Sequence, residues 1–112
     1  MGLVDCGVLT ADDAADDIDH ALRHVIDDWP ARYDTLCCGT LGNIEFLRGA
    51  GHDELALRRL SAVLDSGHNT GSFRWNGGAT RFNVGLFRGL SGVGYICLRL
   101  LDDTLPNVLT WE

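Results

Sequence analysis

Hydrophobic residues recur at helical spacing in four stretches of the chain, and glycine or proline separates one stretch from the next. In the first stretch, Thr10 followed three residues later by Asp13 is typical of a helix N-cap, and Pro30 sets the outer limit of the helix. One face carries Ile18, Leu22, Val25, Ile26 and Trp29. The pattern therefore predicts an amphipathic helix between residues 10 and 30.

Three further helices are expected along the chain. A short stripe of Leu41, Ile44, Leu47 and Ala50 stops at Gly51. Asp53 is placed to cap a third helix that carries apolar residues and ends near Gly67. A fourth helix, over about residues 91–101, follows a second glycine cluster. These helices predict an all-α fold class.

Two segments lack helical periodicity. Residues 72–83 combine short apolar runs with Asn76-Gly77, which predicts a short hairpin or an ordered loop. Residues 106–111 begin with proline and end on Trp111, whose exposure would be costly, so we expect this tail to pack back on the body.

The chain contains an internal repeat. Residues 39–42 (GTLG) match residues 89–92 (GLSG) at an offset of 50 (89 minus 39). Such periods are typical of repeat architectures, in which each unit buries its apolar faces against its neighbours. In this chain the expected unit is a glycine turn that enters an inner helix, followed by an outer helix. The same offset counted backwards falls before Met1, so we expect the chain to begin inside a repeat, with N-terminal repeats absent.

Charge and composition exclude several classes of partner. The formal net charge is -7, there is no lysine, and no arginine-rich face is visible, so we expect no nucleic acid or anionic membrane partner. No apolar run approaches the length of a membrane span, and no targeting segment is present, so a cytoplasmic location is expected. In a reducing compartment, four cysteines favour metal binding or catalysis over disulfides.

Cys37 and Cys38 are the candidate metal ligands. Zinc prefers thiolate and imidazole ligands in tetrahedral array, and neighbouring residues can both ligate where Gly39 allows a sharp turn. The other role open to the pair is structural, because free cysteine often behaves as a small buried apolar residue.

Other candidate residues are given structural roles. His20 and His24 lie one helical turn apart, but Ala21 replaces the glutamate of a metalloprotease motif. Cys97 lies in an apolar run and is expected in the core, and Cys6 has no partner at ligand spacing. The glycines between residues 85 and 94 are expected to form helix-entry turns rather than a phosphate loop, because no lysine exists to complete one.

Four segments carry a family resemblance: residues 36–47 (LCCGTLGNIEFL), 85–95 (GLFRGLSGVGY), 98–101 (LRLL) and 105–109 (LPNVL). Together they resemble the lanthionine synthetase C-like (LanC-like) cyclase family, most closely the C-terminal cyclase domain of class II (LanM-type) lanthipeptide synthetases. The resemblance implies an α/α toroid of seven helical hairpins. Residues 1–112 would be the C-terminal part of that domain, about the last two hairpins, with the N-terminal repeats and any dehydratase domain absent.

The resemblance also implies a zinc enzyme that adds cysteine thiols of a lanthipeptide precursor peptide to dehydroalanine or dehydrobutyrine, forming thioether rings. Cys37 and Cys38 match the Cys-Cys form of the family's paired zinc ligands, which should make the bound thiolate more nucleophilic than a histidine-containing set would. The family's first cysteine ligand and its acid-base residues have no match here. We therefore expect two zinc ligands, no catalytic residue in this chain, and no activity of the chain alone.

Two alternatives stay open at this point. One is a non-enzymatic helical-repeat interaction module, which would self-associate through an exposed repeat seam at inner-helix residues such as Leu98 and Leu101. The other is a complete small metal-binding domain that takes Cys6 or a histidine as its third ligand. Measuring the zinc content of the chain would distinguish these two alternatives from a cyclase fragment.

Overall fold

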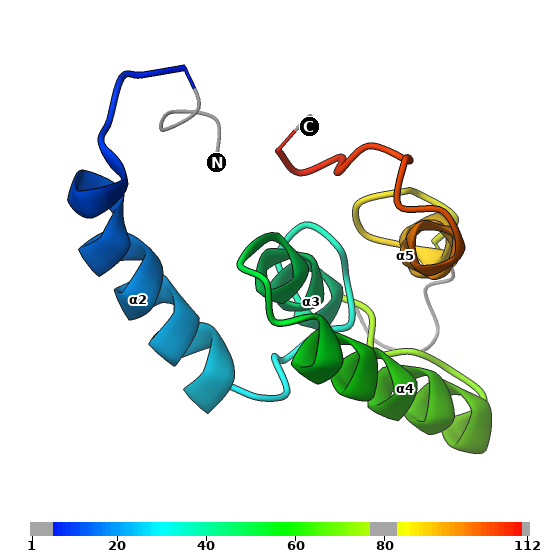
Figure 1. Ribbon diagram of the computed structural model, residues 1–112. Helices are drawn as coiled ribbons and strands as arrows, with labels where there is room; N and C mark the ends of the chain where they lie inside the picture. The colour runs from blue at the N-terminus through cyan, green and yellow to red at the C-terminus, as the bar shows by residue number, and fades with distance from the viewer. Residues whose placement is uncertain (1–5, 77–82, 111–112) are drawn as a thin grey trace.

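The computed structural model of the protein describes residues 6–76 and 83–110, and these residues form helices and no strands (Figure 1). The helices are α2 (Ala11–Asp27), α3 (Thr40–Gly49), α4 (Asp53–Thr70) and α5 (Leu90–Leu101). The predicted all-α class is confirmed, and each expected helix is found.

Polar side chains satisfy backbone groups at both ends of helix α2. The Asp13 amide donates to Thr10 Oγ1 at 3.1 Å, and the Thr10 amide donates to Asp13 Oδ2 at 3.0 Å, which completes a capping box. At the other end, the Arg59 guanidinium from α4 donates to the carbonyl oxygens of Val25 at 2.8 Å and Ile26 at 2.9 Å. Arg59 thus satisfies carbonyls that the last helical turn leaves without partners.

Helix α4 differs from the prediction at both ends. Asp53 is its first residue, and His52 occupies the cap position without a side-chain hydrogen bond. Gly67 does not end the helix, which continues to Thr70 and stops at Gly71, a left-handed residue with φ of 74°. A Cβ atom at position 67 would lie 2.5 Å from Cε1 of Phe73, so this glycine makes room for an aromatic ring.

The hydrophobic core surrounds α3, which lies in the middle of the molecule between α2 and α5, with α4 packed alongside (Figure 1). Leu36, Leu41, Ile44 and Leu47 are fully buried, and α4 and α5 contribute to the same cluster. The buried set is Leu36, Leu41, Ile44, Leu47, Ala56, Leu60, Val63, Trp75, Val93 and Ile96. Burial of apolar stripes therefore holds α3, α4 and α5 together, while Leu22, Val25 and Trp29 of the first helical segment are only partly buried against this cluster.

The two glycine turns have the same backbone geometry. The amide of Thr40, the first residue of α3, donates to the carbonyl of Tyr33 at 2.8 Å. Fifty residues later, the amide of Leu90, the first residue of α5, donates to the carbonyl of Asn83 at 2.8 Å. The sequence repeat is therefore also a structural repeat.

Close backbone approach explains why glycine stands at the repeated positions. A Cβ atom on Gly39 would lie 2.4 Å from the Tyr33 carbonyl oxygen, and one on Gly92 would lie 2.3 Å from that of Leu86. Neither distance is possible for a real side chain, so the turn can form only without a Cβ atom at these positions.

The expected loop and tail are described in part. Residues 72–76 run without strand structure, and the remainder of the predicted hairpin or ordered loop, up to residue 82, lies outside the described residues. In the tail, Val108 packs against the core, and the Tyr95 hydroxyl donates to the Pro106 carbonyl at 2.9 Å. Trp111 lies outside the described residues. Among the helices that are described, none is long and apolar enough to cross a membrane.

Candidate metal centre

Cys37 and Cys38 lie in the exposed turn that leads into α3. Leu36, directly before them, is fully buried, while both cysteine side chains reach solvent. The two sulfur atoms are 3.2 Å apart. The Cys37 amide donates to the carbonyl of Phe87 at 2.9 Å, which ties the first glycine turn to the second. The thiol pair is therefore exposed on a turn whose backbone is fixed.

Asp34 and Arg74 fix the start of this turn. The Arg74 amide donates to Asp34 Oδ2 at 2.9 Å and its Nε donates to the same oxygen at 3.1 Å, while its Nη2 donates to Oδ1. In return, the Asp34 amide donates to the Arg74 carbonyl at 2.8 Å. The Asp34 side chain is only 4% exposed, whereas that of Arg74 is 43% exposed, so the carboxylate is shielded from water and the guanidinium is partly open to it.

A cavity of about 110 Å³ opens beside the sulfur atoms. Its walls are Tyr33, Thr35, Cys37, Cys38, Asn76 and Arg88. Arg88 stands at the repeat position of Cys38, 50 residues later, and the bond from Cys37 to Phe87 brings it next to the thiols. The second turn therefore contributes a positive charge where the first contributes sulfur.

The environment of Cys37 acts on its pKa in opposing directions. The hydrogen bond and charge of Cys38, followed by burial, raise the pKa of the Cys37 thiol, while the nearby charge of Arg88 lowers it. The net direction is upward. Cys37 therefore retains its proton more readily than an isolated cysteine.

The cysteine pair fits two positions of a zinc site. Tetrahedral zinc with bonds of about 2.3 Å holds two sulfur ligands about 3.8 Å apart, which the observed pair can reach by rotation of exposed side chains. In the part of the chain that the structure describes, no three His, Cys, Asp or Glu side chains gather in a possible metal cluster. Cys6 and the four histidines are among these described residues, and none of them gathers with the thiol pair into such a cluster.

The structure differs from the sequence prediction at Cys97 and adds an ion pair between Asp34 and Arg74 that was not predicted. Cys97 on α5 is part-buried rather than fully in the core, and burial raises the pKa of its thiol. The pairing of Asp34 with Arg74 was not predicted, because 40 residues separate them and no local pattern links them. Its physical basis, a buried carboxylate that needs a cationic partner, becomes visible only once the fold buries Asp34.

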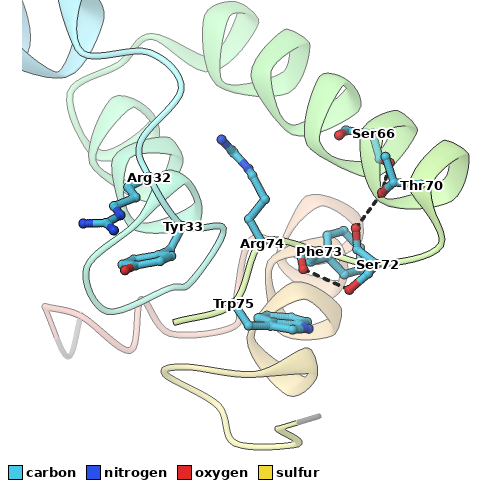
Figure 2. A pocket seen from close by; sticks show the side chains of 8 residues that line it. All are labelled: Arg32, Tyr33, Ser66, Thr70, Ser72, Phe73, Arg74 and Trp75. Atoms are coloured by element: carbon cyan, nitrogen blue, oxygen red, sulfur yellow. Dashed lines mark hydrogen bonds between the residues drawn. The ribbon is translucent and has the colours of Figure 1, made fainter. Parts of the chain in front are cut away.

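A larger cleft of about 510 Å³ (Figure 2) shares Tyr33 with the thiol cavity. Arg32 and Tyr33 line one side of it, the C-terminal part of α4 lines another, and residues 72–75 complete its walls, while the Arg32 guanidinium points away from α4 (Figure 2). The sequence analysis did not identify this cleft, because its lining comes from three separate segments.

The fold and the thiol pair define a helical-repeat protein with a candidate thiolate metal centre at one glycine turn. A family model described as "Lanthionine synthetase C-like protein" matches residues 5–111, and the chain therefore belongs to this family. No curated protein and no solved structure matches the chain.

Proposed function

We propose that this chain provides the Cys-Cys pair of a zinc-dependent lanthipeptide cyclase of the LanM type, as the C-terminal part of the cyclase domain. The proposed reaction joins a peptide cysteine to a dehydroalanine or dehydrobutyrine in the precursor peptide. A carbon–sulfur bond forms at the β-carbon, and the α-carbon gains a proton, so lanthionine or methyllanthionine results. The observation that carries the proposal is an exposed thiol pair, 3.2 Å apart, in a chain that the family matches over residues 5–111.

Cys37 and Cys38 would hold the zinc ion in this proposal. Bound zinc lowers the pKa of a thiol and so keeps the peptide sulfur nucleophilic at neutral pH. The chain's own contribution is positional, since Leu36 is buried beneath the turn and the Cys37 amide is bonded to Phe87. Arg88 adds a positive charge beside a centre rich in thiolates.

The proposal assigns no acid-base residue to this chain. Among the described residues, no histidine or carboxylate joins the thiol pair in a cluster, so the proton delivered to the α-carbon requires a group outside them. The third protein ligand is likewise required from outside the described residues. We therefore propose that the chain alone is inactive as a cyclase.

A cysteine-containing peptide tests the proposed chemistry. The full chain would be titrated with zinc in the presence of a short peptide with one cysteine, and separately with its serine counterpart. We expect the cysteine peptide to tighten zinc binding, because its sulfur supplies a further ligand, and we expect the serine peptide to have no effect. Equal zinc affinity with both peptides would argue against a substrate-binding metal centre.

A non-enzymatic interaction module is the second candidate, and exposed leucines on α5 favour it. Leu98 is 54% exposed and Leu101 is 86% exposed. These side chains form the repeat seam, through which a second copy could associate. If this were the sole function, a Cys37→Ser, Cys38→Ser variant would self-associate as the unchanged chain does, and zinc would have no effect on either.

A further inference from the structure

The larger cleft has aromatic walls. Tyr33, Phe73 and Trp75 line it, and the rings of Phe73 and Trp75 contact each other with centroids 5.6 Å apart (Figure 2). The Thr70 and Ser72 hydroxyls are engaged internally, since Thr70 Oγ1 lies 2.7 Å from the Ser66 carbonyl oxygen and 2.8 Å from that of Ser72, and Ser72 Oγ lies 3.0 Å from the Phe73 carbonyl oxygen. The charged groups that line the cleft are the arginines.

The cleft and the thiol cavity are adjacent. Tyr33 lines both, and Trp75 in the cleft is followed directly by Asn76 in the thiol cavity. A peptide lying across Tyr33 would therefore present one residue to the cleft and a neighbouring residue to Cys37 and Cys38.

The combined region is positive in an otherwise acidic protein. Arg32, Arg74 and Arg88 line the two cavities, and no aspartate or glutamate is among the lining residues, although the chain carries a net charge of -7. The positive charge of Arg74 is balanced by its ion pair with Asp34. Arg32 forms no ion pair with any residue that the structure describes, and its guanidinium lies 5.4 Å from the centre of the Tyr33 ring.

We propose that this cleft binds an acidic peptide segment, with Arg32 donating hydrogen bonds to a carboxylate and the aromatic walls contacting the adjoining backbone. This inference rests on the proposed function in so far as the peptide is the cyclase substrate. It makes the cleft a specificity subsite that favours an aspartate or glutamate close to the residue that reaches the thiol pair. The positive charge of Arg32 favours an anionic group. A carboxylate suits it best, because the planar guanidinium can donate two parallel hydrogen bonds to the two carboxylate oxygens.

A matched pair of synthetic peptides tests the subsite. The two would be fluorescently labelled, free of cysteine, and identical except for a central glutamate or glutamine, and their binding to the full chain would be followed by fluorescence anisotropy. We expect the glutamate peptide to bind about fivefold more tightly at low salt, the scale of an exposed ion pair, and the difference to shrink at high salt.

Variants assign the preference to Arg32. Arg32→Gln should abolish the difference between the two peptides, and Arg32→Lys should restore part of it. Arg58→Gln, which removes an exposed charge on α4 outside the cleft, should leave the difference unchanged. Equal affinity for both peptides, or an equal loss in Arg58→Gln, would overturn the inference, as would tighter binding of a single-stranded oligonucleotide used as a third probe.

The experiment is independent of the metal. Because the probes lack cysteine, the glutamate preference should persist in the Cys37→Ser, Cys38→Ser variant. A glutamate preference in the unchanged chain together with no zinc binding by that chain, even with the cysteine peptide, would contradict the proposed cyclase function and leave the acidic-peptide proposal standing. Zinc binding by the unchanged chain without a glutamate preference would contradict the acidic-peptide proposal and leave the proposed metal centre unaffected.

Discussion

Glu45 on α3 and Arg99 on α5 form a buried ion pair, with 3.2 Å between Oε2 and Nε. The side chains are only 2% and 11% exposed, and the two groups lie within ion-pair distance without the alignment of a hydrogen bond. Arg48 donates to the other Glu45 oxygen at 3.1 Å and to the Arg99 carbonyl at 3.2 Å. One carboxylate therefore holds two arginines where the inner helices of successive repeats meet.

Removing this carboxylate should destabilise the fold strongly. Glu45→Ala leaves the Arg48 and Arg99 charges buried without an acidic partner, so we expect the free energy of unfolding to fall by about 3–5 kcal/mol. Urea unfolding followed by circular dichroism measures the change. Asp65→Ala, at an exposed position on α4, serves as the control and should change stability by less than about 0.5 kcal/mol. A similarly small effect of Glu45→Ala would show that the ion pair does not hold the helices together.

Two glycines on α5 should respond in opposite directions to the same substitution. In Gly92→Ala the new methyl group meets the Leu86 carbonyl oxygen, whereas nothing lies within 4 Å of a Cβ atom at Gly94. We expect Gly92→Ala to lower the free energy of unfolding by about 1–3 kcal/mol, as overpacking does. Gly94→Ala should raise it by up to about 1 kcal/mol, because alanine favours a helix. Thermal unfolding of both variants decides the point, and equal shifts would contradict the described turn.

The capping box of α2 should make stability depend on acid pH. Hydrogen bonds from the Thr10 side chain and backbone lower the pKa of Asp13 below its usual 3.8. Because the folded-state pKa is the lower one, the ionised carboxylate stabilises the fold above pH 3.8, and this contribution is lost as the pH falls through the folded-state value. The stability gap between the unchanged chain and Asp13→Asn should therefore close in that range.

Thr10→Val tests whether the capping box causes this pH dependence. Without the hydroxyl group, Asp13 loses its main stabilising partner, so Asp13→Asn should have a smaller effect in the Thr10→Val background than in the unchanged chain. Unfolding at several pH values gives both differences. An Asp13→Asn effect of the same size in both backgrounds would contradict the assignment.

Asp34→Asn should loosen the turn that carries the cysteines. The substitution removes the negative charge that binds the Arg74 guanidinium, and we expect a loss of about 1.5–3 kcal/mol in the free energy of unfolding. Hydrogen exchange at the Arg74 amide, which donates to Asp34 Oδ2, should accelerate. Asp103→Asn, at an exposed position, should change neither quantity. Unchanged exchange at Arg74 would show that this pairing does not fix the turn.

Local patterns predicted the helices, and sterically required glycines predicted the repeat. Thr10 and Asp13 are three residues apart, so their capping box could be predicted from the sequence itself. The end of α4 was misplaced because Gly67 serves a ring packed from outside the helix, and only the fold brings Phe73 there. Glycine alone does not distinguish a helix end from a packing contact.

The sequence identified the two cysteines of the candidate site, but it did not identify the residues that surround them. Adjacent cysteines before a glycine mark a turn in the sequence, but the bond from Cys37 to Phe87 spans 50 residues. Arg32 and Arg74 meet at one cleft only because the loop after α4 returns to the segment before α3. Long-range pairings of this kind have no signal in a single sequence.

Equilibrium titration of the full chain with zinc, against a competing chelator, tests the central claim most directly. The unchanged chain would be compared with the Cys37→Ser, Cys38→Ser variant and with Cys97→Ser, which removes a part-buried thiol on α5. We predict saturable zinc binding that Cys97→Ser retains and that the double variant loses. Zinc binding of equal strength in the double variant, or no binding by the unchanged chain, would contradict a metal centre at Cys37 and Cys38.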